Sequence, residues 1–157
     1  MRRPDLLHRV DRVMQEFSLP RLSISDFQRA ENQVIFQLVL ESLEQDLAEP
    51  LSFVLNGLDL PMMEWADVLL ARTEKLDPVE DRVLEGLLRD ILQLRKIYLG
   101  ESIDYYRFQM EDLQQTGDSQ AGEVAQRVFQ HTQVLLRLDK ALARYTSRTA
   151  AATHVNT

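Results

Sequence analysis

The three histidines, His8, His131 and His154, are the side chains of this sequence best suited to proton transfer near neutral pH. They lie far apart and lack the spacing of metal ligands. His131 falls between Val128 and Leu135 in an apolar repeat, with no nucleophile motif near it. We therefore expect His131 to be a partly buried, hydrogen-bonded packing residue rather than a catalytic one.

Acidic residues could serve metal-dependent chemistry. The stretch from Glu85 to Asp90 loosely resembles the acidic cluster of nucleotidyl transferases, but its spacing is too long and no strand precedes it. Glu41, Glu44 and Asp46 fit a solvated helix face. The sequence contains no cysteine, no phosphate-binding glycine loop and no HExxH motif. These observations predict a chain that is not an enzyme and that has no metal site and no cofactor.

An aromatic cluster, Tyr105-Tyr106 with Phe108 and Met110, could stack on nucleic-acid bases. Arg107 is the only basic residue inside it, and acidic residues flank it. The whole chain carries a net charge of -7, whereas duplex-binding domains usually present a basic face. We expect these aromatic residues to pack within the fold or against a protein partner, and we expect no direct binding of duplex DNA.

The composition indicates a globular helical protein without a membrane anchor. The 157 residues are 45% hydrophobic and 27% charged, and five glycines with five prolines favour helices joined by short connections. No apolar run approaches the roughly 20 residues of a membrane span, and the start has no secretory signal. The cytoplasm is therefore the expected location.

The clearest structural pattern lies in the last third of the chain, where apolar residues alternate at spacings of four and three. This is the seam of a helix that packs lengthwise against another helix. A long helical stretch from about Val79 to Leu113 precedes it, and residues 115–119 form the turn. Together they predict a helical hairpin. The seam residues are Val124, Val128, His131, Leu135, Leu138, Leu142 and Tyr145.

The N-terminal half predicts a bundle of short helices separated by prolines. Phe36 should lie in its core. The buried side of a later helix should consist of Trp65, Val68, Leu69 and Leu70. Asp77-Pro78 fits the start of the long helix. The predicted fold is all-α, with a helical bundle over residues 1–78, a long helix and hairpin over 79–146, and a frayed tail over 147–157.

Three motifs resemble the C-terminal domain of bacterial DnaG-type primases. They are Arg2-Arg3-Pro4-Asp5-Leu6-Leu7, Leu22-Ser23-Ile24-Ser25-Asp26-Phe27 and Ala30-Glu31-Asn32-Gln33-Val34-Ile35-Phe36. The resemblance covers roughly Arg2 to Tyr145. It implies a bundle followed by a hairpin, and a domain that binds the N-terminal domains of the hexameric replicative helicase at the bacterial replication fork and modulates the helicase during primer synthesis. By the same resemblance, the parent protein would be a primase whose catalytic core is absent from this chain.

Three alternatives remain. One is the similar N-terminal domain of the helicase itself, and another is a helical adaptor that self-associates through the hairpin. The third is a small enzyme whose active-site residues are dispersed along the sequence. Under the leading interpretation, the docking surface lies off the seam, where Leu136 gives a small apolar centre with a basic rim. The predicted helicase-binding residues are Gln133, Leu136, Arg137, Lys140 and Arg144.

Overall fold

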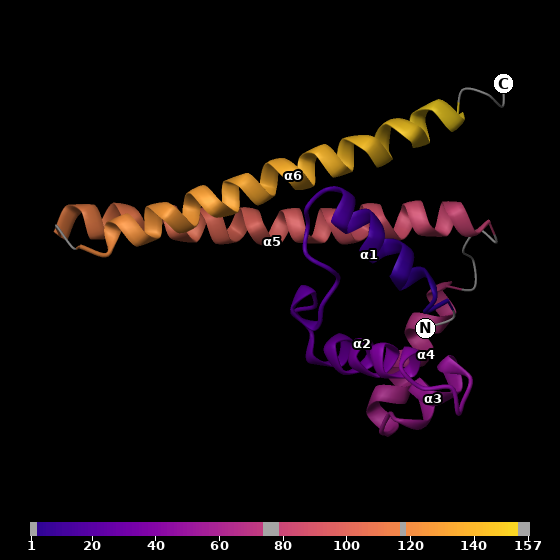
Figure 1. The fold of residues 1–157 in the computed structure, drawn as a ribbon. Helices are drawn as coiled ribbons and strands as arrows, with labels where there is room; N and C mark the ends of the chain where they lie inside the picture. The colour runs from indigo at the N-terminus through magenta and orange to yellow at the C-terminus, as the bar shows by residue number, and fades with distance from the viewer. Residues whose placement is uncertain (1–2, 74–78, 117–118, 154–157) are drawn as a thin grey trace. The chain divides into compact units, whose positions relative to one another are not determined.

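The computed structural model describes residues 3–73, 79–116 and 119–153, and for residues 116 and 146–153 it describes the backbone alone. The described residues form helices and connections without strands, which confirms the predicted all-α fold (Figure 1). The predicted helix start at Asp77-Pro78 lies outside the described residues. The elements are α1 (Leu6–Glu16), the 3-10 helix η1 (Ile24–Asp26), α2 (Ala30–Leu43), α3 (Pro50–Asn56), α4 (Leu60–Thr73), α5 (Glu80–Thr116) and α6 (Ala121–Thr153).

The chain forms two compact units, and both α1 and α5 contribute to each of them. Unit 1 contains Met1–Val13 and Pro20–Leu84, and unit 2 contains Met14–Leu19 and Glu85–Thr157. The sequence places the division at residue 78 and assigns all of the N-terminal helix to the bundle. Helix α6 keeps a helical backbone to Thr153, beyond Ser147, where the sequence predicts the start of a frayed tail.

Unit 1 is built around α2. Phe36 is 7% exposed and its ring centroid lies 4.9 Å from that of Phe27, which confirms the predicted core position. A cluster of buried residues in this unit comprises Ile35, Val39, Val54, Leu58 and Ala66.

Helix α4 buries a face that matches the predicted one at Trp65 and Leu69 but not at Val68. Its inward residues follow the spacing of one helical stripe, Met62, Trp65, Ala66 and Leu69, with Ala66 fully buried. Val68 lies off this stripe and is 43% exposed, so its predicted burial is wrong. Trp65 is only partly buried, because its indole Nε1–H donates to Asn32 Oδ1 at 2.9 Å at the edge of the core.

Helix α3 begins at a proline and is followed by a glycine. Glu49 caps it by accepting a hydrogen bond from the Ser52 backbone N–H at 2.9 Å, and Pro50 is its first residue. The helix stops at Gly57, whose φ of -84° any residue adopts. A Cβ at Gly57 would lie 2.9 Å from Leu38 Cδ2, so the Leu38 side chain would have to shift to admit a larger residue here.

An ion-pair cluster in unit 1 joins the start of α1 to the start of α5. Glu80 accepts from Arg3 at 2.7 Å and from Arg9 at 2.6 Å, while Arg3 also pairs with Asp5 and Arg9 with Asp81. The hydrogen bonds from the two guanidinium groups lower the pKa of Glu80 below its ordinary value. The first motif of the resemblance therefore contributes to the packing of unit 1.

In unit 2, a Schellman motif ends α1. The Leu19 N–H donates to the Met14 carbonyl and the Ser18 N–H to the Gln15 carbonyl, each at 2.9 Å. Ser18 adopts φ 53°, the left-handed conformation that favours glycine. Met14 and Leu19 are buried on either side of this turn.

Candidate docking surface on the hairpin

Helices α5 and α6 lie side by side as an antiparallel hairpin (Figure 1). Two contacts fix how they align. Lys96 Nζ lies 2.6 Å from Asp139 Oδ1, and farther along α5 the Tyr106 ring packs edge-on against His131, with centroids 5.4 Å apart. Higher residue numbers on α5 therefore lie beside lower residue numbers on α6, so the two helices are antiparallel.

The predicted seam of α6 is confirmed. Val124, Leu138, Leu142 and Tyr145 are buried, with Leu138 only 1% exposed. His131 is partly buried as predicted, but its Nδ1 has no hydrogen-bond partner within the described part of the chain. The predicted hydrogen bond is therefore not made by Nδ1, and the imidazole contacts the ring of Tyr106.

The five predicted docking residues all lie on α6 and are all exposed, but they fall into two groups. Arg137 Nη1 donates to the Ser18 carbonyl at 3.2 Å. Arg144 pairs with Glu16 at 3.2 Å, and its guanidinium lies 5.6 Å from the Phe17 ring centroid. These two arginines therefore hold the Met14–Leu19 segment within unit 2, a contact that helical periodicity alone does not predict.

Gln133, Leu136 and Lys140 form the second group, whose side chains have no hydrogen bond or ion pair to other described residues. Leu136 is 58% exposed. Phe129 lies one turn before Gln133 on the same stripe and is 63% exposed, although it is not among the predicted docking residues. We call Phe129, Gln133, Leu136 and Lys140 the α6 outer face.

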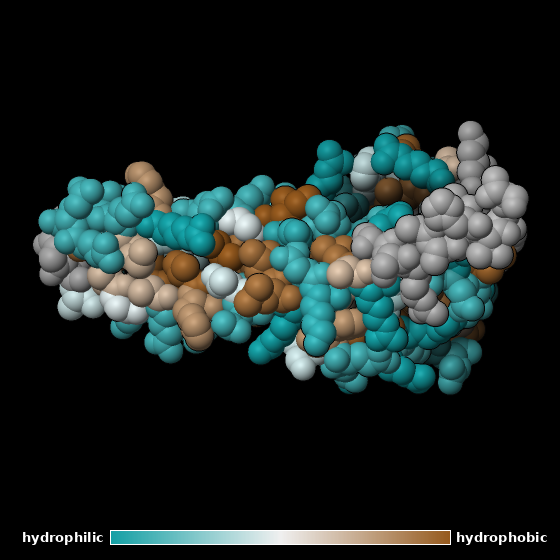
Figure 2. Space-filling view, turned by 90° about the horizontal axis from the view of Figure 1, so that it is seen from above, coloured by the Kyte–Doolittle hydropathy of each residue, from teal (hydrophilic) through white to brown (hydrophobic). Residues whose placement is uncertain are grey.

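The aromatic cluster of α5 likewise divides into side chains that pack inside the hairpin and side chains that are exposed. Tyr106 packs inside the hairpin, where it contacts His131 and lies 5.9 Å from the guanidinium carbon of Arg127. Tyr105 and Phe108 are exposed on α5, at 63% and 65%. Figure 2 shows hydrophobic side chains gathered along the middle of the hairpin, with hydrophilic side chains nearer the turn. The hairpin thus presents exposed apolar side chains from both of its helices.

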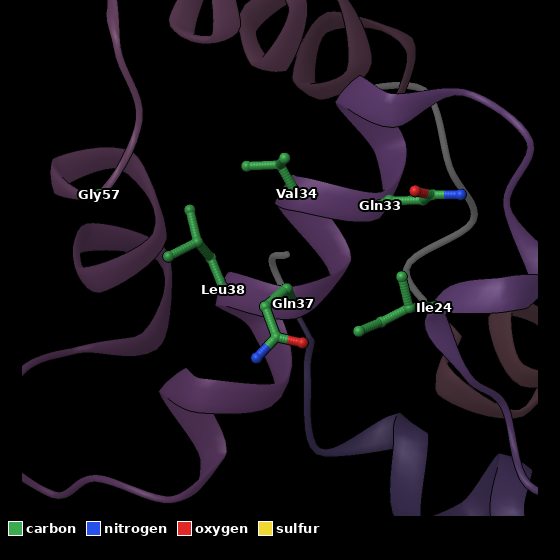
Figure 3. A pocket seen from close by; sticks show the side chains of 6 residues that line it. All are labelled: Ile24, Gln33, Val34, Gln37, Leu38 and Gly57. Atoms are coloured by element: carbon green, nitrogen blue, oxygen red, sulfur yellow. The ribbon is translucent and has the colours of Figure 1, made fainter.

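Unit 1 contains a shallow pocket of about 310 Å³. Val34, Gln37 and Leu38 project toward it from α2, while Ile24 closes one side and Gly57 another (Figure 3). Its lining, completed by Gln33, contains no titratable or nucleophilic side chain, so it cannot supply a general acid, a general base or a nucleophile.

Within the described ranges, no three His, Asp or Glu side chains are arranged to hold a metal ion. None of the described helices is long and apolar enough to cross a membrane. Comparisons with protein families, with curated proteins and with solved structures find no match to this chain. The α6 outer face is therefore the functional candidate that the geometry favours.

Proposed function

We propose that this chain is a non-catalytic docking domain that couples a bacterial DnaG-type primase to the hexameric replicative helicase. The observation that carries the proposal is the α6 outer face, on which Phe129 and Leu136 are solvent-exposed beside Lys140. An apolar centre with a basic neighbour suits a protein interface. The motif order in the sequence, which resembles the primase C-terminal domain, supplies the identity of the partner.

The hairpin seam gives the surface its rigidity. Because Leu138 and Leu142 are buried in the hairpin, α6 is held in place before any partner binds. The outer side chains then project from a preorganised helix, so little conformational entropy of the backbone is lost on binding. Covering Phe129 and Leu136 would contribute about 2–4 kcal/mol together, since each is a little more than half exposed. A micromolar complex requires about 8 kcal/mol, so additional contacts must accompany this surface.

Docking of this kind would bring primer synthesis to newly unwound single strand. An effect on helicase activity would further require that the domain contact two helicase states differently, because a ligand shifts an equilibrium only by its differential affinity.

The test is binding of purified chain to the hexameric helicase, measured by size-exclusion chromatography and titration calorimetry. We expect the Leu136→Asp, Lys140→Glu double variant to keep parental helicity and melting, and to bind at least tenfold more weakly. A matched control is Leu60→Asp, Arg72→Glu, which changes the same residue classes at exposed positions of α4.

Parental affinity in the folded double variant would remove the α6 outer face from the proposal. Self-association without helicase binding would instead support the helical adaptor.

A further inference from the structure

The two ends of the hairpin are packed to different degrees. We call residues 85–99 of α5 with 136–145 of α6 the basal hairpin, and residues 101–115 of α5 with 121–135 of α6, nearer the turn, the distal hairpin. The buried side chains of the basal hairpin are Leu88, Ile91, Leu92, Leu138, Ala141, Leu142 and Tyr145. Among the described side chains of the distal hairpin, only Ile103 and Val124 are buried. Burial of apolar surface, the main source of stability, is therefore concentrated at the base.

The end of α1 adds a third element to the basal hairpin. Arg95 Nη1 of α5 lies 3.9 Å from Met14 Sδ, and Arg137 of α6 donates to the Ser18 carbonyl at 3.2 Å. Met14 and Leu19 are themselves buried. The distal hairpin consists of two helices, which bury only the stripes that face each other, and helices in proteins draw most of their stability from such packing.

Three local features weaken the distal hairpin further. His131 Nδ1 is buried without a hydrogen-bond partner in the described part of the chain, and opening would return this atom to water. Gly100 lies where the distal hairpin begins; a Cβ there would meet no atom within 4 Å, so no packing compensates for the low helix propensity of glycine. The Thr132 hydroxyl donates to the Val128 carbonyl at 2.7 Å, a bond that competes with the backbone bonds of α6.

We propose that the distal hairpin opens on its own, so that its two helices separate and unwind while the basal hairpin and the end of α1 stay folded. A unit with few buried apolar side chains opens at a lower free energy than the whole molecule. Opening would expose Ile103 and Val124 to solvent, and a ligand that binds only the closed form would shift the equilibrium toward closure. This opening is a property of the free chain and does not depend on which partner the chain binds.

Hydrogen exchange of the purified chain, followed by mass spectrometry at low denaturant concentration, tests the proposal. After correction for intrinsic exchange rates, we expect the distal amides of α5 and α6 to exchange together, and at least about tenfold faster than the basal amides. Ile91→Ala should lower the Tm and speed basal exchange about 30-fold or more, while distal exchange stays parental, because the basal hairpin is folded in both forms of the distal opening.

Ile103→Ala is the matched variant, with the same substitution at a buried position of the same helix. It should speed distal exchange about 30-fold or more, because the cavity destabilises only the closed form. The proposal is overturned if parental distal and basal amides share one opening constant, or if Ile91→Ala speeds both sets equally, since the hairpin would then open as one unit. Fast exchange confined to the distal part of one helix would show fraying of that helix instead of paired opening.

Discussion

Replacing Ser18 with glycine should stabilise the protein. Ser18 has φ 53°, and the described chain has no other non-glycine residue with positive φ. A left-handed conformation costs an L-residue about 1–2 kcal/mol, and glycine would remove this cost. Glycine also destabilises the folded state by about 0.4–1 kcal/mol, because its unfolded chain has more conformational freedom. The net gain is about 0.5–1 kcal/mol.

The hydrogen bonds at this site do not depend on the serine side chain. The bonds of the Schellman motif are backbone bonds, and Arg137 donates to the Ser18 carbonyl. Ser18→Gly should therefore raise the Tm by about 1–4 °C in calorimetry and raise the urea midpoint with an unchanged slope. Ser18→Ala, the control, keeps the backbone strain and should not gain stability. A lower Tm for Ser18→Gly would refute the assignment of strain to this residue.

Three further predictions concern the core, the ion pairs and catalysis. Phe36→Ala should lower the free energy of unfolding by about 3–5 kcal/mol in urea titrations, because it removes a buried ring packed on Phe27, and an unchanged midpoint would place Phe36 outside the core. Glu80→Gln should lower the Tm at pH 7. Since the folded pKa of Glu80 lies below its ordinary value of 4.5, the Tm difference between parent and variant should shrink as the pH falls through the folded pKa. A Tm difference that stays constant in acid would show that the ionised Glu80 carboxylate is not the source of the stabilisation. The purified chain should synthesise no RNA primers on a single-stranded template with Mg²⁺, and robust metal-dependent synthesis would contradict the docking assignment.

The sequence predicts the hairpin well because one strong signal specifies it. The alternating spacing from Val124 to Tyr145 identifies the buried seam, and Leu136, on the side of the helix away from this seam, is exposed to solvent. Proline and capping positions such as Pro50 likewise fix where helices begin, because these preferences act within a few residues of the chain.

Contacts between distant segments are what the sequence does not predict. Periodicity alone does not indicate that Arg137 and Arg144 bind the end of α1, so these arginines are indistinguishable from Lys140 before the structure is known. Val68 was misplaced for a related reason: apolar residues occur on several sides of α4, and the packing against α2 and α3 selects one of them. Phe129 lies on the same stripe as Gln133, Leu136 and Lys140, but one turn before the predicted docking residues and outside their basic rim.

The contacts of the Met14–Leu19 segment also determine when it can fold during synthesis. Ser18 bonds to Arg137 and Glu16 to Arg144, across 119 and 128 residues of sequence. At roughly 5–20 residues per second, a ribosome needs roughly 6–26 s to make the intervening chain. Met14 and Leu19 are buried in the finished fold, so during this interval we expect them to be open to chaperones and proteases on the nascent chain. Protease protection of Met14 in ribosome-stalled chains that lack α6 would contradict this timing.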